Sequence, residues 1–168
     1  MNQLAGTFDE GAAAAADSSA PLALAPGLSR LEVVVNPASG GVGARAAADC
    51  ERLLADYPLD ANIAEAGPDQ VEAALAAALA NRPDALIVLA GDGTARTAAA
   101  MAGLDGPPVA PLPGGTMNML PKALYGTTDW KAALVRAITE GVVRPVSGGE
   151  VDGRPFVVVV ADVANEPH

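Results

Sequence analysis

Asp84-Ala-Leu-Ile-Val-Leu-Ala-Gly-Asp-Gly-Thr94 is the stretch that decides the fold. Its apolar residues, Ala85 to Leu89, run without a polar interruption and are followed closely by Gly91-Asp-Gly-Thr94. A short continuous apolar run indicates a strand buried on both faces, which is typical of a parallel sheet. Glycines after such a strand allow a tight turn and a close approach to a ligand, and the next helix offers free N–H groups to an anion. The stretch therefore predicts a phosphate site, with a plain strand-to-helix turn as the alternative.

Two further small-residue loops follow predicted strands in the same way. Arg30–Val35 is rich in β-branched residues and leads into Asn36-Pro-Ala-Ser-Gly-Gly-Val-Gly43. Val109–Pro113 leads into Gly114-Gly-Thr-Met-Asn118, and its prolines predict a position near an edge of the sheet. Each loop alone is also compatible with a flexible connection. Because open α/β sheets bind ligands at the carboxyl ends of their strands, we expect the three loops to form one site.

The rest of the chain alternates between helical and strand-like segments until residue 141. This alternation predicts an α/β fold with a parallel sheet flanked by helices, and the last segments predict a short C-terminal β-hairpin that turns at Val151–Arg154. The predicted helices are 44–56, 70–81, 95–102 and 129–140, and the further strands are 59–66, 142–146 and 154–160.

Composition excludes several classes of function. The net charge of −10 over 168 residues argues against a nucleic-acid partner. No window reaches the ~18 consecutive apolar residues that span a bilayer, so we expect a soluble cytoplasmic protein. The single cysteine, Cys50, lies in a helical, core-like context and is predicted to be structural, while the only histidine is the terminal His168. Without a His or Cys cluster, a zinc site is not expected.

Three regions are expected along the chain. Residues 1–28 are rich in Ala, Gly, Ser and Pro without a sustained apolar period, which predicts a flexible leader. Residues 29–141 form the predicted nucleotide-binding α/β domain, and residues 142–168 the start of a truncated β-rich second domain. Exposed strand edges near the C-terminus favour self-association into a homodimer.

Together, Asn36-Pro-Ala-Ser-Gly40, Gly91-Asp-Gly-Thr94 and Pro113-Gly-Gly-Thr-Met-Asn118 resemble, in order and spacing, the catalytic domain of the diacylglycerol, sphingosine and ceramide kinase superfamily. Bacterial diacylglycerol kinase-like lipid kinases are similar, and the resemblance covers residues 31 to about 160. It implies a three-layer, Rossmann-like domain that forms the nucleotide-binding half of a two-domain kinase. That kinase would transfer the γ-phosphate of ATP to a membrane lipid such as diacylglycerol.

The resemblance also implies which residues form the site. Asp92 would be essential for catalysis and would act with Mg²⁺, since a carboxylate beside phosphate oxygens needs a cation or a hydrogen-bond donor. Arg45, Arg96 and Lys122 lie next to the loops and could neutralise phosphates. No residue is predicted as part of a dedicated metal site. The nucleotide would contact Asn36, Ser39, Gly40, Gly91, Asp92, Gly93, Thr94, Gly115, Thr116 and Asn118.

The sequence also departs from the family pattern. Ala90 replaces the first of two glycines, Thr97 stands where an acid is common, and Met119 follows Asn118 in place of an Asp. The second domain, which would carry the general base, is represented at most by residues 142–168. These departures favour, as an alternative, a catalytically incomplete module that binds ATP or a protein partner. NAD kinases share the Gly-Asp-Gly-Thr motif, but residues 113–118 fit an NAD kinase-like activity less well than they fit a lipid kinase.

Overall fold

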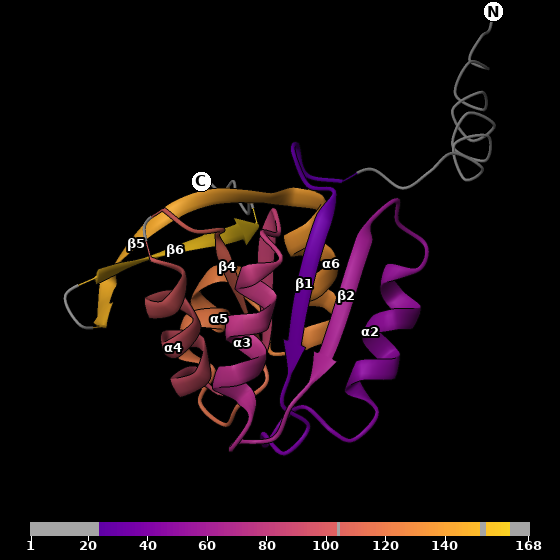
Figure 1. The fold of residues 1–168 in the computed structure, drawn as a ribbon, viewed down its shortest axis with the longest axis horizontal. Helices are drawn as coiled ribbons and strands as arrows, with labels where there is room; N and C mark the ends of the chain where they lie inside the picture. Colours follow the sequence, from indigo (N-terminus) through magenta and orange to yellow (C-terminus); the bar gives the residue numbers. More distant parts are fainter. Residues whose placement is uncertain (1–23, 104, 152–153, 162–168) are drawn as a thin grey trace, which may run out of the picture.

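The fold is known from a computed structural model that describes residues 24–103, 105–151 and 154–161 (Figure 1). The predicted leader therefore lies outside the described residues as far as residue 23. The elements are β1 (Arg30–Val35), α2 (Ala46–Leu54), β2 (Asp60–Glu65), α3 (Val71–Ala80), β3 (Ala85–Ala90), α4 (Asp92–Ala102), β4 (Val109–Pro113), α5 (Met119–Tyr125), α6 (Trp130–Glu140), β5 (Gly141–Val151) and β6 (Arg154–Ala161).

The described strands form one six-stranded sheet in the order β2-β1-β3-β4-β6-β5. The first four are parallel to their neighbours; β6 runs parallel to β4, and β5 pairs antiparallel with β6. The α/β fold with a parallel sheet and a C-terminal β-hairpin is thus confirmed. The hairpin is longer than predicted, because β5 continues to Val151 past an irregularity between Val146 and Glu150. Its turn residues, 152 and 153, lie outside the described residues.

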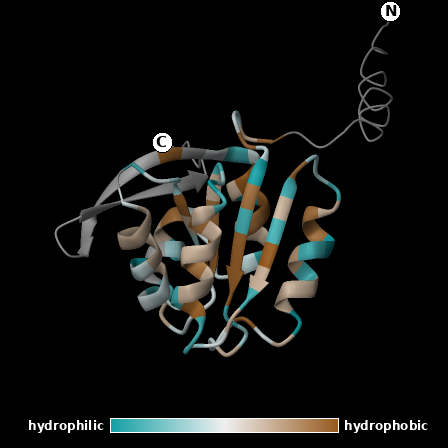
Figure 2. Cartoon of the chain, in the orientation of Figure 1, coloured by the Kyte–Doolittle hydropathy of each residue, from teal (hydrophilic) through white to brown (hydrophobic). Residues whose placement is uncertain are grey.

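Helices cover both faces of the sheet and make three layers. One core lies between the sheet and α2, α5 and α6, and the other lies between the sheet and α3 and α4. Alternate residues of β3 enter the two cores: Ile87 and Leu89 the first, Leu86 and Val88 the second. This is why β3 has an uninterrupted apolar sequence, as a strand buried on both faces requires. In Figure 2, β1 likewise becomes hydrophobic toward its carboxyl end.

The prediction that residues 109–113 lie near an edge of the sheet is wrong. β4 lies between β3 and β6. It pairs with β3 along its whole length but with β6 only where Val109 faces Val158. Pro111 and Pro113, which lack an N–H donor, therefore lie beyond that single pairing with β6, and the position inside the sheet tolerates them.

The last residues assigned to the leader pack against the domain. Ala25 is buried, and its N–H donates to the carbonyl oxygen of Ile138 at 2.8 Å. Leu24 and Leu28 contact the core beneath α6. Residues 24–28 thus pack against the α/β domain before β1 begins.

Cys50 is fully buried in α2, as its sequence context predicted. Burial, followed by the negative charges of Asp49 and Glu51, raises the pKa of its thiol to about 12. The thiol stays protonated near neutral pH and is a poor nucleophile. Among the described residues, no helix is both long enough and apolar enough to cross a bilayer.

Candidate functional site

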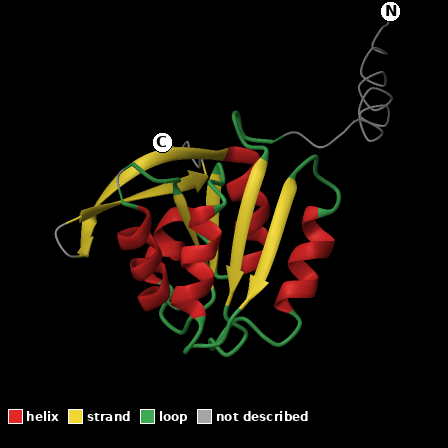
Figure 3. Cartoon of the chain, viewed as in Figure 1, coloured by secondary structure: helices red, strands yellow, loops and turns green. Residues whose placement is uncertain are grey.

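The three predicted loops meet at the carboxyl edge of the sheet, below the arrowheads of β1 and β2 in Figure 3. We name them by their strands: the β1 loop (Asn36–Gly43), the β3 turn (Gly91) and the β4 loop (Gly114–Asn118). The N–H of Asn36 donates to the carbonyl oxygen of Leu89 at 3.0 Å, and that of Gly41 to the carbonyl oxygen of Gly114 at 3.1 Å. The structure thus brings residues from all three motifs into one region.

The β4 loop crosses directly over the end of β3. An ideal Cβ placed on Gly114 would lie 2.8 Å from the nitrogen of Ala90 and 2.8 Å from Cγ2 of Val42. A Cβ on Gly115 would lie 2.8 Å from Cα of Gly91. Contacts this close exclude any side chain, so both glycines are needed for packing between backbones. The crossing allows the β4 loop to touch the β1 loop, although β3 separates their strands in the sheet.

Helix α4 begins earlier than predicted. Its first residue is Asp92, so Gly93 and Thr94 belong to its first turn and not to a loop. Gly91 is the N-cap with φ −79° and ψ 174°, which any residue can adopt. The turn from β3 to α4 is thus a single residue long, but neither Gly91 nor Gly93 uses the positive φ that glycine permits. As the N-cap, Gly91 has no side chain that could cap the helix. The N–H groups of the first turn are therefore directed toward the carboxyl edge of the sheet, where an anion can bind them.

Asn36 and Asn118 are the buried polar residues of this edge, each with 7% of its surface exposed. Oδ1 of Asn36 accepts from the N–H of Ala38 at 3.0 Å, and Oδ1 of Asn118 accepts from the N–H of Gly115 at 2.7 Å. Asn118 adopts a left-handed backbone, with φ 52° and ψ 42°. Among the described residues, neither Nδ2 group has a hydrogen-bond acceptor. Within that part of the chain, two buried donors thus remain available to a ligand.

The third buried polar side chain differs from the two asparagines in how its polar atoms are hydrogen bonded. Glu32 also has 7% of its surface exposed, but Oε1 accepts from Nδ2 of Asn62 at 3.0 Å and Oε2 from Nδ2 of Asn81 at 2.9 Å. Both carboxylate oxygens are satisfied within the protein. Glu32 therefore has a structural role, linking β1 to β2 and to the end of α3.

The remaining predicted residues line the rim of the loops. Ser39 is half-buried and its backbone closes the turn of the β1 loop, accepting from the N–H of Val42 at 3.1 Å. Gly40 and Thr116 are exposed and adjacent, since a Cβ on Gly40 would lie 3.3 Å from Oγ1 of Thr116. Asp92, Gly93 and Thr94 form the first turn of α4, where Asp92 is partly exposed.

The three predicted cations remain predictions. Arg45, Arg96 and Lys122 are all exposed, at the start of α2, on α4 and on α5 respectively. The salt bridges found among the described residues instead involve Arg52, Lys131 and Arg136.

Two of the family departures have a structural explanation. The side chain of Ala90 belongs to the core beneath α3 and α4, so its methyl group is not directed at the loops. Thr97 donates from Oγ1 to the carbonyl oxygen of Gly93 at 3.1 Å, one turn earlier on α4. No cluster of three or more His, Cys, Asp or Glu residues occurs in the described ranges. Asp92 is the one carboxylate of the three motifs, a donor set that fits Mg²⁺ only when phosphate oxygens complete it.

Sequence reasoning missed α5 and the role of Val42. Asn118 before α5 and Gly126 after it are ordinary cap residues and could have revealed this seven-residue helix. Val42 stands among glycines, and only the structure shows that it is buried, with 7% of its surface exposed.

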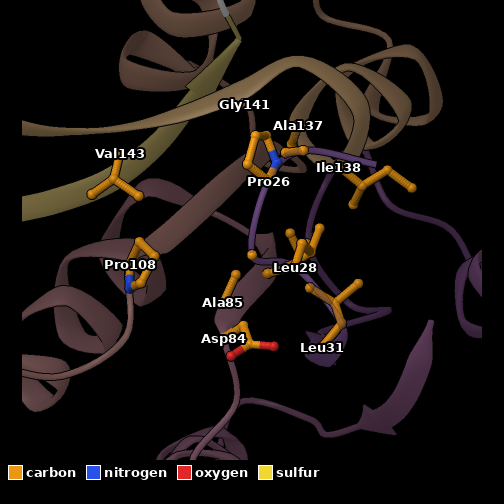
Figure 4. Close-up of a pocket in the computed structure, with 13 residues that line it drawn as sticks. Pro26, Leu28, Leu31, Asp84, Ala85, Pro108, Ala137, Ile138, Gly141 and Val143 are labelled. Atoms are coloured by element: carbon orange, nitrogen blue, oxygen red, sulfur yellow. The ribbon is translucent and has the colours of Figure 1, made fainter. Parts of the chain in front are cut away.

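A hollow lies at the opposite, amino edge of the sheet (Figure 4). Apolar residues of the segment before β1, of α6 and of the start of β5 line it, together with the carboxylate of Asp84. None of the predicted site residues lies there. Asp84 is engaged within the protein: its Oδ2 accepts from the N–H of Arg30 at 2.8 Å, and from the N–H and the hydroxyl of Ser29 at 3.0 and 3.1 Å. This hollow is therefore a place where parts of the fold pack together. The three loops at the carboxyl edge are the candidate site.

Asp84 yields a pH-dependent prediction. Its hydrogen bonds, first from the N–H of Arg30 and then from that of Ser29, lower the pKa of its carboxyl group. Because the pKa is lowered, the ionised carboxylate stabilises the fold at pH values above its ordinary pKa of 3.8. This contribution is lost as the pH falls through the lowered pKa. Asp84→Asn is expected to reduce the free energy of unfolding at pH 7, and the gap from wild type should narrow at an acid pH well below the ordinary pKa of 3.8. Urea unfolding at both pH values tests this; an equal gap at both would contradict it.

Comparison with known families gives a match over most of the chain. The family described as "Diacylglycerol kinase catalytic domain" matches residues 30–151, which is more than half of the chain and includes all three loops. A comparison with curated proteins gives no match.

Proposed function

The chain belongs to the diacylglycerol kinase catalytic domain family, and from this premise we propose that it binds ATP on the three loops and transfers the γ-phosphate to a lipid hydroxyl. A membrane lipid such as diacylglycerol is the proposed acceptor. On this proposal the protein works in the cytoplasm at a membrane surface, with residues 142–168 beginning a second domain that contacts the lipid. Self-association through the β5 edge is proposed as a route to a homodimer.

The observation that carries the proposal is a pair of Nδ2 donors, on Asn36 and Asn118, for which the described residues supply no acceptor. Both side chains are buried, and both use their Oδ1 atoms within the protein. The Oδ1 atom of Asn118 and the nitrogen of Asp92 each lie 3.6 Å from the position that a Cβ on Gly115 would occupy. The side-chain amide thus lies close to the start of α4. Amide donors beside a helix N-terminus suit a ligand with several acceptor oxygens, such as a triphosphate.

Each group of the site has a distinct task in the proposed reaction. The first-turn N–H groups of α4 and the two asparagine amides would hold phosphate oxygens and orient the γ-phosphate. Gly114 and Gly115 would keep the β4 loop close to the backbone at the end of β3, where the ligand can approach the backbone. Asp92 would hold Mg²⁺ together with phosphate oxygens, and the ion would neutralise charge that develops during transfer.

A second candidate function rests on the acidic groups. Phosphoryl transfer needs the acceptor hydroxyl placed in line with the γ-phosphate and its proton removed. Asp92 is the one carboxylate that the three motifs supply. This observation favours a module that binds ATP without turning it over, unless a further segment or partner provides the acceptor half.

Phosphate transfer to lipid tests the proposal. Wild type and Asp92→Asn are incubated with Mg²⁺, radiolabelled ATP and phosphatidylcholine vesicles that contain diacylglycerol. The expected result is a labelled phospholipid with wild type and a fall of roughly 100-fold or more with Asp92→Asn, since the amide is a weaker metal ligand. Equal circular dichroism of the two proteins serves as the folding control.

The other outcomes separate the candidates. ATP binding by calorimetry without any labelled lipid would favour the non-catalytic module. Absence of both binding and transfer in a folded protein would overturn both functions.

A further inference from the structure

Val42 is the single buried residue between Asn36 and Ala46. Its neighbours Gly41 and Gly43 are exposed, and Gly43 has a left-handed backbone with φ +91°. Backbone this rich in glycine has little intrinsic stiffness. Contacts of the buried Val42 side chain therefore add to the hydrogen bonds that hold the β1 loop in position.

The side chain of Val42 connects the loop to two other parts of the molecule. It belongs to the core that contains Ala46 and Cys50 of α2. On its other side, Cγ2 lies 2.8 Å from the point where a Cβ on Gly114 would stand, so it packs directly against that glycine. The adjacent N–H of Gly41 donates to the carbonyl oxygen of Gly114 at 3.1 Å. One methyl group and one hydrogen bond thus join the β1 loop to the β4 loop.

We propose that Val42 is a positioning residue of the nucleotide site, one that sets the spacing between the β1 and β4 loops without touching the ligand. This inference rests on the proposed function. The exposed residues that the two loops bring together, Gly40 and Thr116, lie beyond the Val42–Gly114 contact. Loss of that contact would let the β1 loop move away and misplace the donors on its side of the site.

Three variants separate positioning from stability. Val42→Ala removes the methyl group that packs against Gly114. Val42→Thr keeps the β-branched shape but introduces a buried hydroxyl, so it lowers stability while holding the loop in place. Leu54→Ala removes a larger side chain from the same core at the far end of α2. All three are expected to melt at lower temperatures than wild type.

Calorimetric titration with Mg·ATP, at a temperature where every variant is folded, gives the functional result. Val42→Ala is expected to raise the Kd about tenfold, because small misplacements of binding groups have large effects. Val42→Thr and Leu54→Ala should stay within about twofold of wild type, since neither moves the loop. Wild-type affinity in Val42→Ala, or an equal loss in Leu54→Ala, would overturn the proposal.

Hydrogen exchange of the Gly41 amide, without nucleotide, provides a test that does not need ATP binding. Its exchange is expected to quicken in Val42→Ala beyond the change in core amides, and to follow those amides in Leu54→Ala. If wild type binds no Mg·ATP, the proposed function fails, whereas exchange still decides whether Val42 positions the loop. Unchanged relative exchange of Gly41 in Val42→Ala would refute the positioning role.

Discussion

Replacing Gly114 with alanine is expected to lower the free energy of unfolding by about 3 kcal/mol, at the upper end for overpacking a core. The new methyl group would lie 2.8 Å from the nitrogen and 2.9 Å from the oxygen of Ala90, and 2.8 Å from Cγ2 of Val42. The Ala90 atoms are backbone of the central strand β3 and cannot rotate away. Urea unfolding followed by the fluorescence of the single, buried Trp130 measures the loss. The affinity for nucleotide should fall as well, because the added methyl group would force the β4 loop away from β3.

Gly93→Ala is the matched control. A Cβ at Gly93 meets no atom within 4 Å, and the residue already lies in the first turn of α4. Alanine favours a helix over glycine by up to about 1 kcal/mol, so stability should stay equal or rise. Similar unfolding curves for Gly93→Ala and Gly114→Ala would show that the loop crossing does not have the tight geometry described.

Asn118→Asp is expected to weaken Mg·ATP binding about 100-fold while the protein stays folded. The substitution keeps an oxygen that can accept from the N–H of Gly115, and aspartate tolerates both the N-cap position and the left-handed backbone of Asn118. It replaces the Nδ2 donor with a negatively charged oxygen, which repels phosphate. Calorimetric titration gives the affinity, and the melting temperature reports on the fold.

Two further variants serve as comparisons for Asn118→Asp. Gln70→Glu adds the same charge at an exposed position outside the loops, so its affinity should stay within about twofold of wild type. Asn118→Gly keeps the left-handed backbone but removes both functions of the side chain, and should lose affinity together with order in the β4 loop. Wild-type affinity in Asn118→Asp would show that Nδ2 does not reach the ligand.

The parts of the fold that depend on hydrophobic pattern followed from the sequence. β1 and β3 lie within a residue of their predicted bounds, because β-branched residues mark β1, a continuous apolar run marks β3, and Asn36 and Gly91 directly follow them. The position of β4 did not follow. Prolines suggest an edge, but they are compatible with an inner strand that pairs with β6 at one residue pair. α5 was missed because a seven-residue helix after a glycine loop has almost no periodicity of its own.

The location of the candidate site was predictable, but its internal contacts were not. Parallel strands end at one edge, so loops after β1, β3 and β4 had to be neighbours. Spacing along the chain does not reveal that Gly114 crosses over Ala90, nor which atoms of Asn36 and Asn118 are already used. These features depend on distances between backbones and on side-chain rotation, which only the folded chain determines.

The crossing of the β4 loop over β3 also bears on the order in which the protein assembles. Gly41 and Gly114, whose backbones are hydrogen bonded, are far apart in the sequence, and loop closure of that length makes such contacts slow to form. During synthesis from the N-terminus, β1 and β3 can pair and α4 can form before residue 114 has left the ribosome, yet the loops remain unjoined. The ligand site can therefore form only once β4 has joined the sheet, after β1 and β3 have paired, and ligand affinity would report that step.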